Sequence, residues 1–212
     1  MDTRPSELTV GDFIGQLATG APAPGGGSAS ALAGAMGAAL VQMVVALTTG
    51  RADAADLEDD LRELGVAAAG FQSELLQLVE IDAAAYGSVI AARRLPRETE
   101  LERESRRVQI DAAVREATRS PLTIAERANE VLKLAERLAP IGSRNAISDA
   151  GVAGLLAAAA LRGGALNVRI NLPFLSDDEP LRRDAGERVD RLLDGLDERE
   201  AALRAAVAER LG

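Results

Sequence analysis

The chain has 212 residues, a formal net charge of −9, and neither cysteine nor histidine. Its length suits one domain with a real core, and its negative charge argues against a nucleic-acid partner. Without histidine, Ser-His-Asp and Cys-His catalysis and the usual catalytic zinc sites are excluded. Without cysteine there is no disulfide, which suits the cytoplasm. We expect a cytoplasmic protein with no metal site, whose acid–base chemistry falls to carboxylates, Tyr86, Lys133 or water.

The apolar residues indicate the fold class. They make up 47% of the chain, but aromatic residues make up only 2%. A core of Ala, Leu and Val suits close-packed helices better than a sandwich or barrel. No repeat and no low-complexity linker divides the sequence. These features predict an all-α, single-domain bundle of about six helices over residues 1–212, with an Ala/Gly-rich central helix.

The first notable stretch is a glycine-rich segment ahead of that central helix. A short helix over 6–18, capped by Ser6 or Thr9, is expected to come first. The run Pro24-Gly25-Gly26-Gly27-Ser28 then predicts a loop with glycines at positive φ and Ser28 as the helix cap. Such a loop presents N–H groups to a carboxylate, a phosphate or a carbonyl.

The following helix, over 29–49, is apolar all round, which predicts that other helices or a second subunit surround it. It is long enough to cross a membrane. However, Ala and Gly dominate it, and neither an aromatic belt nor a basic flank marks its ends. We therefore expect a buried helix of a soluble protein and no membrane partner. Residues 1–10 likewise lack the apolar segment of a signal peptide.

A long helix over 54–94 carries the most unusual polar residue. Asp82 lies on its apolar stripe, where a carboxylate must be paired, hydrogen-bonded or neutralised. Tyr86, four residues later, shares that face. Two interpretations stay open: a buried Asp–Tyr pair that fixes helix register, or an acid or base with a tuned pKa.

The second half of the chain predicts three more helical stretches. A helix over 98–138 begins with a charged, solvated face and should kink or break at Pro121. Ser148 or Asp149 would be an ordinary N-cap for a second Ala-rich helix over 150–161, followed by Gly163 and Gly164. The final helix, over 178–211, is amphipathic.

Between the last two helices lies the polar run Asn167, Arg169 and Asn171. The two asparagines share a helical face, and the arginine points elsewhere. These side chains could recognise a flat polar ligand or form hydrogen bonds between helices; the alternative is that the amides cap the end of their own helix.

Several motifs together resemble a known family. They are Pro24–Ser28, Asp82-Ala-Ala-Ala-Tyr86, Ala92-Arg-Arg-Leu-Pro96, Ser120-Pro-Leu122, Ser148-Asp149 and Asn167-Val-Arg-Ile-Asn171-Leu172. In this order they resemble the cyclodeaminase domain of formiminotransferase-cyclodeaminase and the free-standing methenyltetrahydrofolate cyclohydrolase. The resemblance implies an all-helical fold that forms a homodimer, and a site for a reduced folate near the glycines.

The resemblance also implies one of two reactions. One is hydrolysis of 5,10-methenyltetrahydrofolate to 10-formyltetrahydrofolate. The other is cyclisation of 5-formiminotetrahydrofolate to the methenyl compound with loss of ammonia. The helical part fills the 212 residues, which favours the cyclohydrolase. A non-catalytic helical dimer that binds folate or a protein partner is the alternative from another class.

We place the chemistry on residues within these motifs. Asp82 is the acid or base, Tyr86 orients it, and Asp149 is a second carboxylate. The segment Pro24, Gly25, Gly26, Gly27 and Ser28 binds a carboxylate or polar edge of the substrate, and Asn167, Arg169 and Asn171 recognise the pterin or the glutamate tail. The tetrahydrofolate derivative is the substrate, and we expect no bound cofactor.

Overall fold

A computed structural model describes residues 4–212, and every regular element within that range is helical. Seven α-helices follow one another in this part of the chain, joined in places by short 3-10 turns. The α-helices are α1 (Val10–Leu17), α2 (Gly26–Thr48), α3 (Glu58–Arg93), α4 (Glu100–Leu138), α5 (Ile147–Asn171), α6 (Pro180–Leu193) and α7 (Leu196–Leu211). The 3-10 turns are η1 (Pro5–Glu7), η2 (Ala52–Leu57), η3 (Arg144–Ala146) and η4 (Leu172–Phe174). The predicted all-α fold is confirmed.

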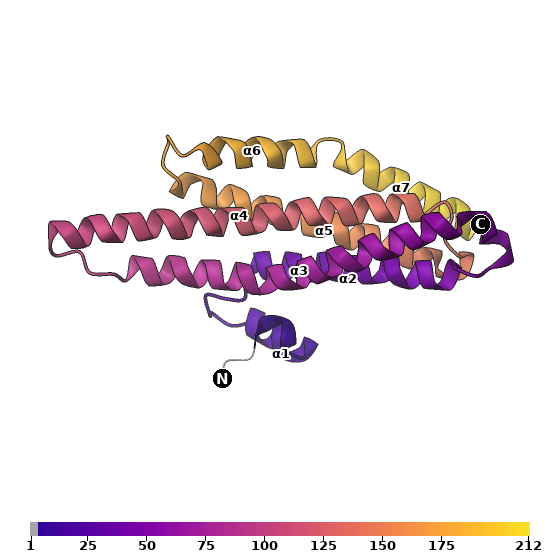
Figure 1. Cartoon of the computed structure of the whole chain (residues 1–212), viewed down its shortest axis with the longest axis horizontal. Helices are drawn as coiled ribbons and strands as arrows, with labels where there is room; N and C mark the ends of the chain where they lie inside the picture. Colours follow the sequence, from indigo (N-terminus) through magenta and orange to yellow (C-terminus); the bar gives the residue numbers. More distant parts are fainter. Residues whose placement is uncertain (1–3) are drawn as a thin grey trace.

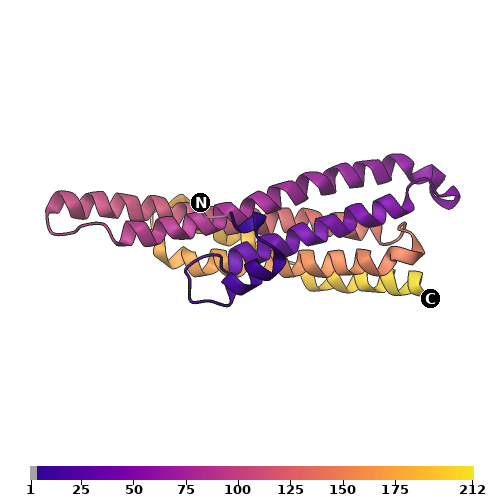
Figure 2. The same cartoon turned by 90° about the horizontal axis from the view of Figure 1, so that it is seen from below.

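Four long helices form the centre of an elongated bundle (Figures 1 and 2). Helix α2 packs against α3 and α5, α4 packs against the same two helices, and α2 and α4 also contact each other. Helices α6 and α7 cover α4 and α5, while α1 lies apart from them near the other side. The hairpin of α3 and α4 extends beyond the rest at one end.

Small residues let the central helices approach closely. A Cβ atom on Gly37 of α2 would lie 2.9 Å from the carbonyl oxygen of Ala153 on α5. A Cβ atom on Gly164 of α5 would lie 2.8 Å from the carbonyl oxygen of Pro121 on α4. Side chains at these positions would force the backbones apart, so the glycines are a condition of this packing.

Two predicted interruptions are absent. Helix α4 continues through Pro121, and α5 continues through Gly163 and Gly164 up to Asn171. Packing on neighbouring helices compensates for the poor helix propensity of these residues. A break appears instead where none was predicted, because Gly195 has φ +66 and separates α6 from α7.

Some of the observed helix starts agree with the N-caps predicted from the sequence. Thr9 caps α1 by accepting from the Asp12 amide, and Thr99 with Glu102 forms a capping box at α4. The N-cap role expected for Ser148 or Asp149 is wrong. Helix α5 begins at Ile147, after Ala146, so both residues lie inside its first turn.

In the part of the chain that the structure describes, three helical stretches are long and apolar enough to cross a membrane by length and composition, namely Gly26–Thr48, Ala54–Arg93 and Arg144–Phe174. Half of the most apolar window of the first and third is buried inside the bundle. Their apolar character is thus partly explained by packing against one another.

Candidate functional site

The glycine-rich segment is the start of a helix and not a positive-φ loop. Gly25 is the N-cap of α2, and Gly26, Gly27 and Ser28 form its first turn. In the described residues only Gly50, Gly195 and Gly212 have positive φ. The predicted glycine conformations and the predicted Ser28 cap are therefore wrong. The first turn still presents backbone N–H groups that have no partner within the helix.

Asp82 of α3 meets this helix start. The Ser28 hydroxyl lies 3.0 Å from Asp82 Oδ2 and can donate a hydrogen bond to it. A Cβ atom on Gly27 would overlap Asp82 Oδ1, so only glycine leaves room for the carboxyl group. The N-terminus of a helix favours a nearby anion. At the start of α2 this position is taken by the Asp82 carboxyl of the same chain.

The surroundings of Asp82 favour its neutral form. Burial raises the pKa of its carboxyl above the usual range, and this is the largest influence. The Ser28 hydroxyl, the Ser28 amide and the Ser120 hydroxyl each lower that pKa, but less than burial raises it. A carboxyl whose pKa is raised in this way is better suited both to take and to return a proton.

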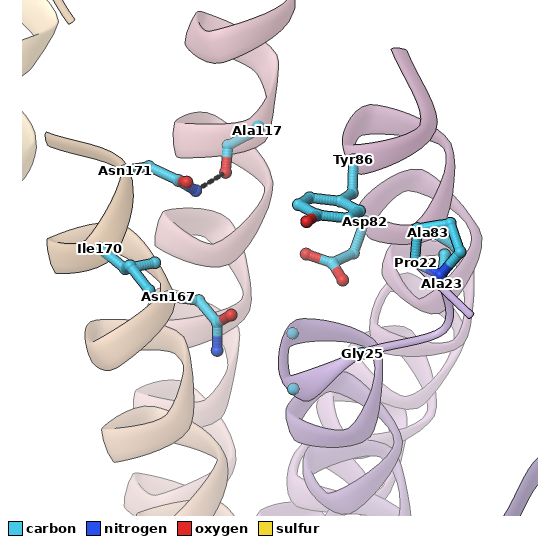
Figure 3. Close-up of a pocket in the computed structure, with 12 residues that line it drawn as sticks. Pro22, Ala23, Gly25, Asp82, Ala83, Tyr86, Ala117, Asn167, Ile170 and Asn171 are labelled. Atoms are coloured by element: carbon cyan, nitrogen blue, oxygen red, sulfur yellow. Dashed lines mark hydrogen bonds between the residues drawn. The ribbon is translucent and has the colours of Figure 1, made fainter. Parts of the chain in front are cut away.

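Asp82 faces a cavity of about 220 Å³ (Figure 3). The walls come from the chain before α2, the first turn of α2, and helices α3, α4 and α5. The cavity brings together the predicted residues Gly25, Gly26, Gly27, Asp82, Tyr86, Asn167 and Asn171. Apart from the carboxyl, the polar side chains in its lining are the Tyr86 hydroxyl and the two amides.

Tyr86 lies beside Asp82 on α3 and faces the same cavity (Figure 3). The side-chain hydrogen bond of Asp82 runs to Ser28, and none joins Asp82 to Tyr86 in the described chain. Tyr86 is 45% exposed. The interpretation of a buried Asp–Tyr pair is thus not supported, and the Tyr86 hydroxyl is free to contact a ligand.

The two asparagines face Asp82 from α5, and each donates to a backbone carbonyl. Asn167 Nδ2 lies 2.8 Å from the carbonyl oxygen of Gly163. Asn171 Nδ2 lies 2.6 Å from that of Ala117 on α4 (Figure 3). Pro121, four residues after Ala117, has no N–H to donate to this carbonyl. Asn171 therefore replaces the helix hydrogen bond that Pro121 removes.

Two other predicted residues lie outside the cavity of their own chain. Arg169 is on the surface, where it pairs with Asp190 of α6 at 2.9 Å. Asp149 is in the first turn of α5, 18 residues before Asn167, which is roughly 27 Å along the helix. Pro24 and Ser28 are buried next to the cavity and do not line it.

Sequence reasoning assigned no role to Ser120. Its hydroxyl, from α4, is buried and lacks a hydrogen-bond partner at ordinary distance among the described residues, yet it lies near enough to Asp82 to lower its pKa. The available signal was a serine directly before a proline inside a helical pattern. Among the side chains that the structure describes, no three acidic residues gather in a way that could hold a metal ion.

Comparison with known proteins identifies the family of this chain. The family model of formiminotransferase-cyclodeaminase matches residues 9–190. A methenyltetrahydrofolate cyclohydrolase of Methylorubrum extorquens is 41% identical over 201 residues, which cover 95% of this chain and 94% of the relative. The formimidoyltransferase-cyclodeaminase of Rattus norvegicus is 33% identical over 166 residues, 78% of this chain but only 31% of that longer protein.

Among solved structures, the formiminotetrahydrofolate cyclodeaminase of Thermotoga maritima superposes with a TM-score of 0.85 at 24% identity, covering 97% of this chain and 98% of the other. This likeness shows the shared fold. With the family match over most of the sequence, it leads to one conclusion: the chain belongs to the formiminotransferase-cyclodeaminase family.

Proposed function

We propose that this protein is an enzyme that hydrolyses 5,10-methenyltetrahydrofolate to 10-formyltetrahydrofolate. The observation that carries the proposal is the Asp82 carboxyl, which is half-buried at a helix start, faces a cavity and has a raised pKa. Support for this particular reaction comes from the cyclohydrolase relative, which is 41% identical and matches almost the whole chain. No bound cofactor is required, because water supplies the oxygen and no atom is oxidised or reduced.

Asp82 is suited to both proton transfers of this reaction. In its ionised form it takes a proton from water as the oxygen adds to the methenyl carbon. It then gives this proton to N5 as the bond between N5 and that carbon breaks. The second proton of the water leaves the hydroxyl group as the formyl C=O forms, so the net change is uptake of water and release of one proton. A group used as base and then as acid works best with a pKa nearer neutrality.

The charge of the substrate also fits this site. The methenyl bridge is an amidinium-like cation, and an adjacent carboxylate stabilises it. The rest of the lining is neutral, with free backbone N–H groups of α2 on one side and two asparagine side chains on the other. We assign the polar edge of the pterin to Tyr86 and to the amide oxygens of Asn167 and Asn171.

A second candidate is the cyclodeaminase reaction, favoured by the identity of 33% to the rat formimidoyltransferase-cyclodeaminase. In that reaction N10 adds to the formimino carbon and the exocyclic nitrogen leaves as ammonia. Protonated Asp82 would then be the acid that protonates the leaving nitrogen. The two reactions differ in the nucleophile and the leaving group, and the same carboxyl serves both.

The deciding experiment follows the absorbance of the methenyl compound with purified protein and each substrate in turn. Loss of the band from methenyltetrahydrofolate, faster than in buffer, is the expected result. Appearance of the band from formiminotetrahydrofolate, with ammonia released, would favour the cyclodeaminase. No change with either substrate would contradict both reactions and leave a folate-binding or interaction protein.

We further propose that the protein forms a soluble homodimer through the outer faces of α2 and α5. Helix α2 has no charged side chain over its 23 residues, although 27% of the chain is charged. Its outer face exposes Met36, Met43 and Leu47, and the adjoining α5 exposes Val152 and Leu155. An uncharged helix with exposed apolar side chains, next to further exposed apolar side chains of α5, is unusual on a soluble monomer and suits burial against a second copy.

The dimer is tested by sedimentation of protein purified without detergent. Twice the chain mass is expected for the wild type, and half that mass for Met43→Glu, which places a charge in the interface. The variant Val66→Glu, at an exposed apolar residue of α3, is the control. A monomeric wild type would contradict the proposal, as would recovery only in detergent, which would point to a membrane.

A further inference from the structure

The Ser28 hydroxyl lies between two acceptors and can donate to only one of them at a time. Its oxygen is 3.0 Å from Asp82 Oδ2 and 3.1 Å from the carbonyl oxygen of Val79, which is also on α3. Ser28 is completely buried. A serine hydroxyl has one hydrogen to donate and two lone pairs to accept, so these two contacts describe two different hydrogen-bond arrangements.

Each arrangement fits one protonation state of Asp82. When Asp82 is ionised, the Ser28 hydroxyl donates to Oδ2. When Asp82 is protonated on Oδ2, its O–H donates to the Ser28 oxygen, and the Ser28 hydrogen turns to the Val79 carbonyl. All groups are satisfied in both states, because a helical carbonyl has a second lone pair for this contact. No heavy atom has to move.

We propose that Ser28 is a positioning residue that turns its hydroxyl between Val79 and Asp82 each time Asp82 loses and regains its proton. This inference rests on the proposed function, in which Asp82 acts first as base and then as acid. It assigns Ser28 to the proton chemistry and not to substrate binding, as its position behind the cavity lining also indicates.

The side chains around Asp82 are uncharged, so the Ser28 hydroxyl has a large influence on the protonation state of Asp82. In the described chain, α3 offers the Tyr86 hydroxyl, α4 the Ser120 hydroxyl, and α5 the amides of Asn167 and Asn171. The segment before α2 and its first turn add only Pro, Ala and Gly to the lining. Among the described residues that line the cavity or influence this carboxyl, no Lys or Arg compensates the charge of Asp82. The ionised state is therefore held by dipoles that must reorient, and a hydroxyl reorients at little cost.

The arrangement also explains why Ser28 follows a glycine. The missing Cβ of Gly27 lets the Asp82 carboxyl approach the first turn of α2. The Ser28 amide, in the same turn, lowers the pKa of that carboxyl together with the Ser28 hydroxyl. One residue thus offers a fixed donor and a rotating donor to the same group.

The test is the pH dependence of kcat/KM for the wild type, Ser28→Ala and Ser30→Ala. Ser30 is a matched control, since it is buried in the same helix and its hydroxyl bonds locally to the carbonyl of Gly26 at 2.7 Å. In Ser28→Ala the ionised form of Asp82 loses the side-chain donor that lies 3.0 Å from Oδ2. The limb of the profile that reports Asp82 should therefore move to higher pH by about one unit, the size expected for one hydrogen bond to a charged group. Ser30→Ala should leave that limb in place.

A lower rate in Ser28→Ala with an unmoved limb would overturn the inference, because a merely structural serine changes rate without changing the titration. Ser28→Thr keeps the hydroxyl and should restore the wild-type limb.

If Ser28→Ala does not fold, the same point is tested by the carboxyl titration of Asp82. This titration is followed by 13C NMR in the wild type and in Ser28→Thr or Ser28→Cys. The weaker thiol donor should raise the titration midpoint, and an unchanged midpoint would contradict the inference. This titration needs no turnover, so failure of the proposed reaction and failure of the Ser28 role are distinguishable.

Discussion

The two sides of the cavity hold their polar side chains in different ways. On the acid wall, Asp82 and Tyr86 line the cavity and Ser28 lies directly behind them. The described lining places no Lys or Arg beside the half-buried carboxyl, and its partial burial raises its pKa. On the amide wall, formed by Asn167 and Asn171, each side chain donates to a backbone carbonyl. The amide wall therefore stabilises the fold, whereas the acid wall keeps a group whose ionised form is disfavoured by folding. A carboxyl kept at a position where folding disfavours its ionised form is typical of a catalytic site.

The largest effect is expected for Asp82→Asn, which removes the acid and keeps its shape. The value of kcat/KM should fall by about 10²- to 10⁴-fold, the usual contribution of general acid–base catalysis. The absorbance assay measures this loss, and circular dichroism checks the helices. Near-normal activity would remove Asp82 from the mechanism.

The same variant should not lose stability at neutral pH. Because the folded-state pKa of Asp82 is raised, its contribution to stability is full below its unfolded pKa of about 3.9 and is lost as pH rises through the folded pKa. Asp82→Asn should then have a Tm at pH 7 equal to or above that of the wild type, and the difference should shrink towards pH 4. A clearly lower Tm at pH 7 would show that capping of α2 by the carboxylate outweighs its burial.

Gly27→Ala should disturb the acid wall without changing its chemistry. The new Cβ overlaps Asp82 Oδ1, so the carboxyl must move away from Ser28. A displacement of about 1 Å in a catalytic group can cost about 100-fold in rate, and we expect a loss of that order in kcat/KM. Gly70→Ala in α3 is the control, because a Cβ there meets nothing within 4 Å. It should retain activity, and equal losses in both variants would contradict the account.

Asn171→Ala tests the amide wall through stability. It leaves the Ala117 carbonyl without a donor, and the free energy of unfolding should fall by about 1–3 kcal/mol. Pro121→Ala restores an N–H to that carbonyl, so Asn171→Ala should cost less in the Pro121→Ala background. A double-mutant cycle by urea unfolding measures this coupling. Additive effects would show that Asn171 does not compensate for the proline.

The smallest effect is expected for Arg169→Ala, outside both walls. Arg169 pairs with Asp190 on the surface, and such pairs contribute about 0–1 kcal/mol. We expect kcat and KM to stay unchanged and Asp190→Ala to behave in the same way. A raised KM in Arg169→Ala alone would return this residue to the substrate site.

Much of the fold was accessible from the sequence, because helix periodicity and caps are local. The stripe that marks Asp82 and the end of the helix predicted over 29–49, which lies at Thr48 in the structure, are features of this kind. Continuity of α4 through Pro121 was not predictable, since it depends on a donor 50 residues further along the chain. The break at Gly195 was missed because the amphipathic stripe continues across it.

The site could be predicted less completely, because it depends on how segments distant in the sequence pack together. Asp82, Tyr86, Asn167 and Asn171 were recognised as polar residues in apolar surroundings, and they do meet at one cavity. The orientation of Ser28 and the place of Ser120 depend on how three helices pack, which periodicity does not encode. The order of the motifs groups Asp149 with the other site residues, but the length of α5 separates it from them within one chain.

The most direct test of the account is the titration of Asp82 itself, by 13C NMR of aspartate-labelled protein with Asp82→Asn to assign the signal. The account predicts a carboxyl pKa above the ordinary value of about 3.9, because burial outweighs the hydrogen bonds from α2 and α4. A pKa at or below that value would show a stably ionised helix cap and would contradict a role for Asp82 in moving protons.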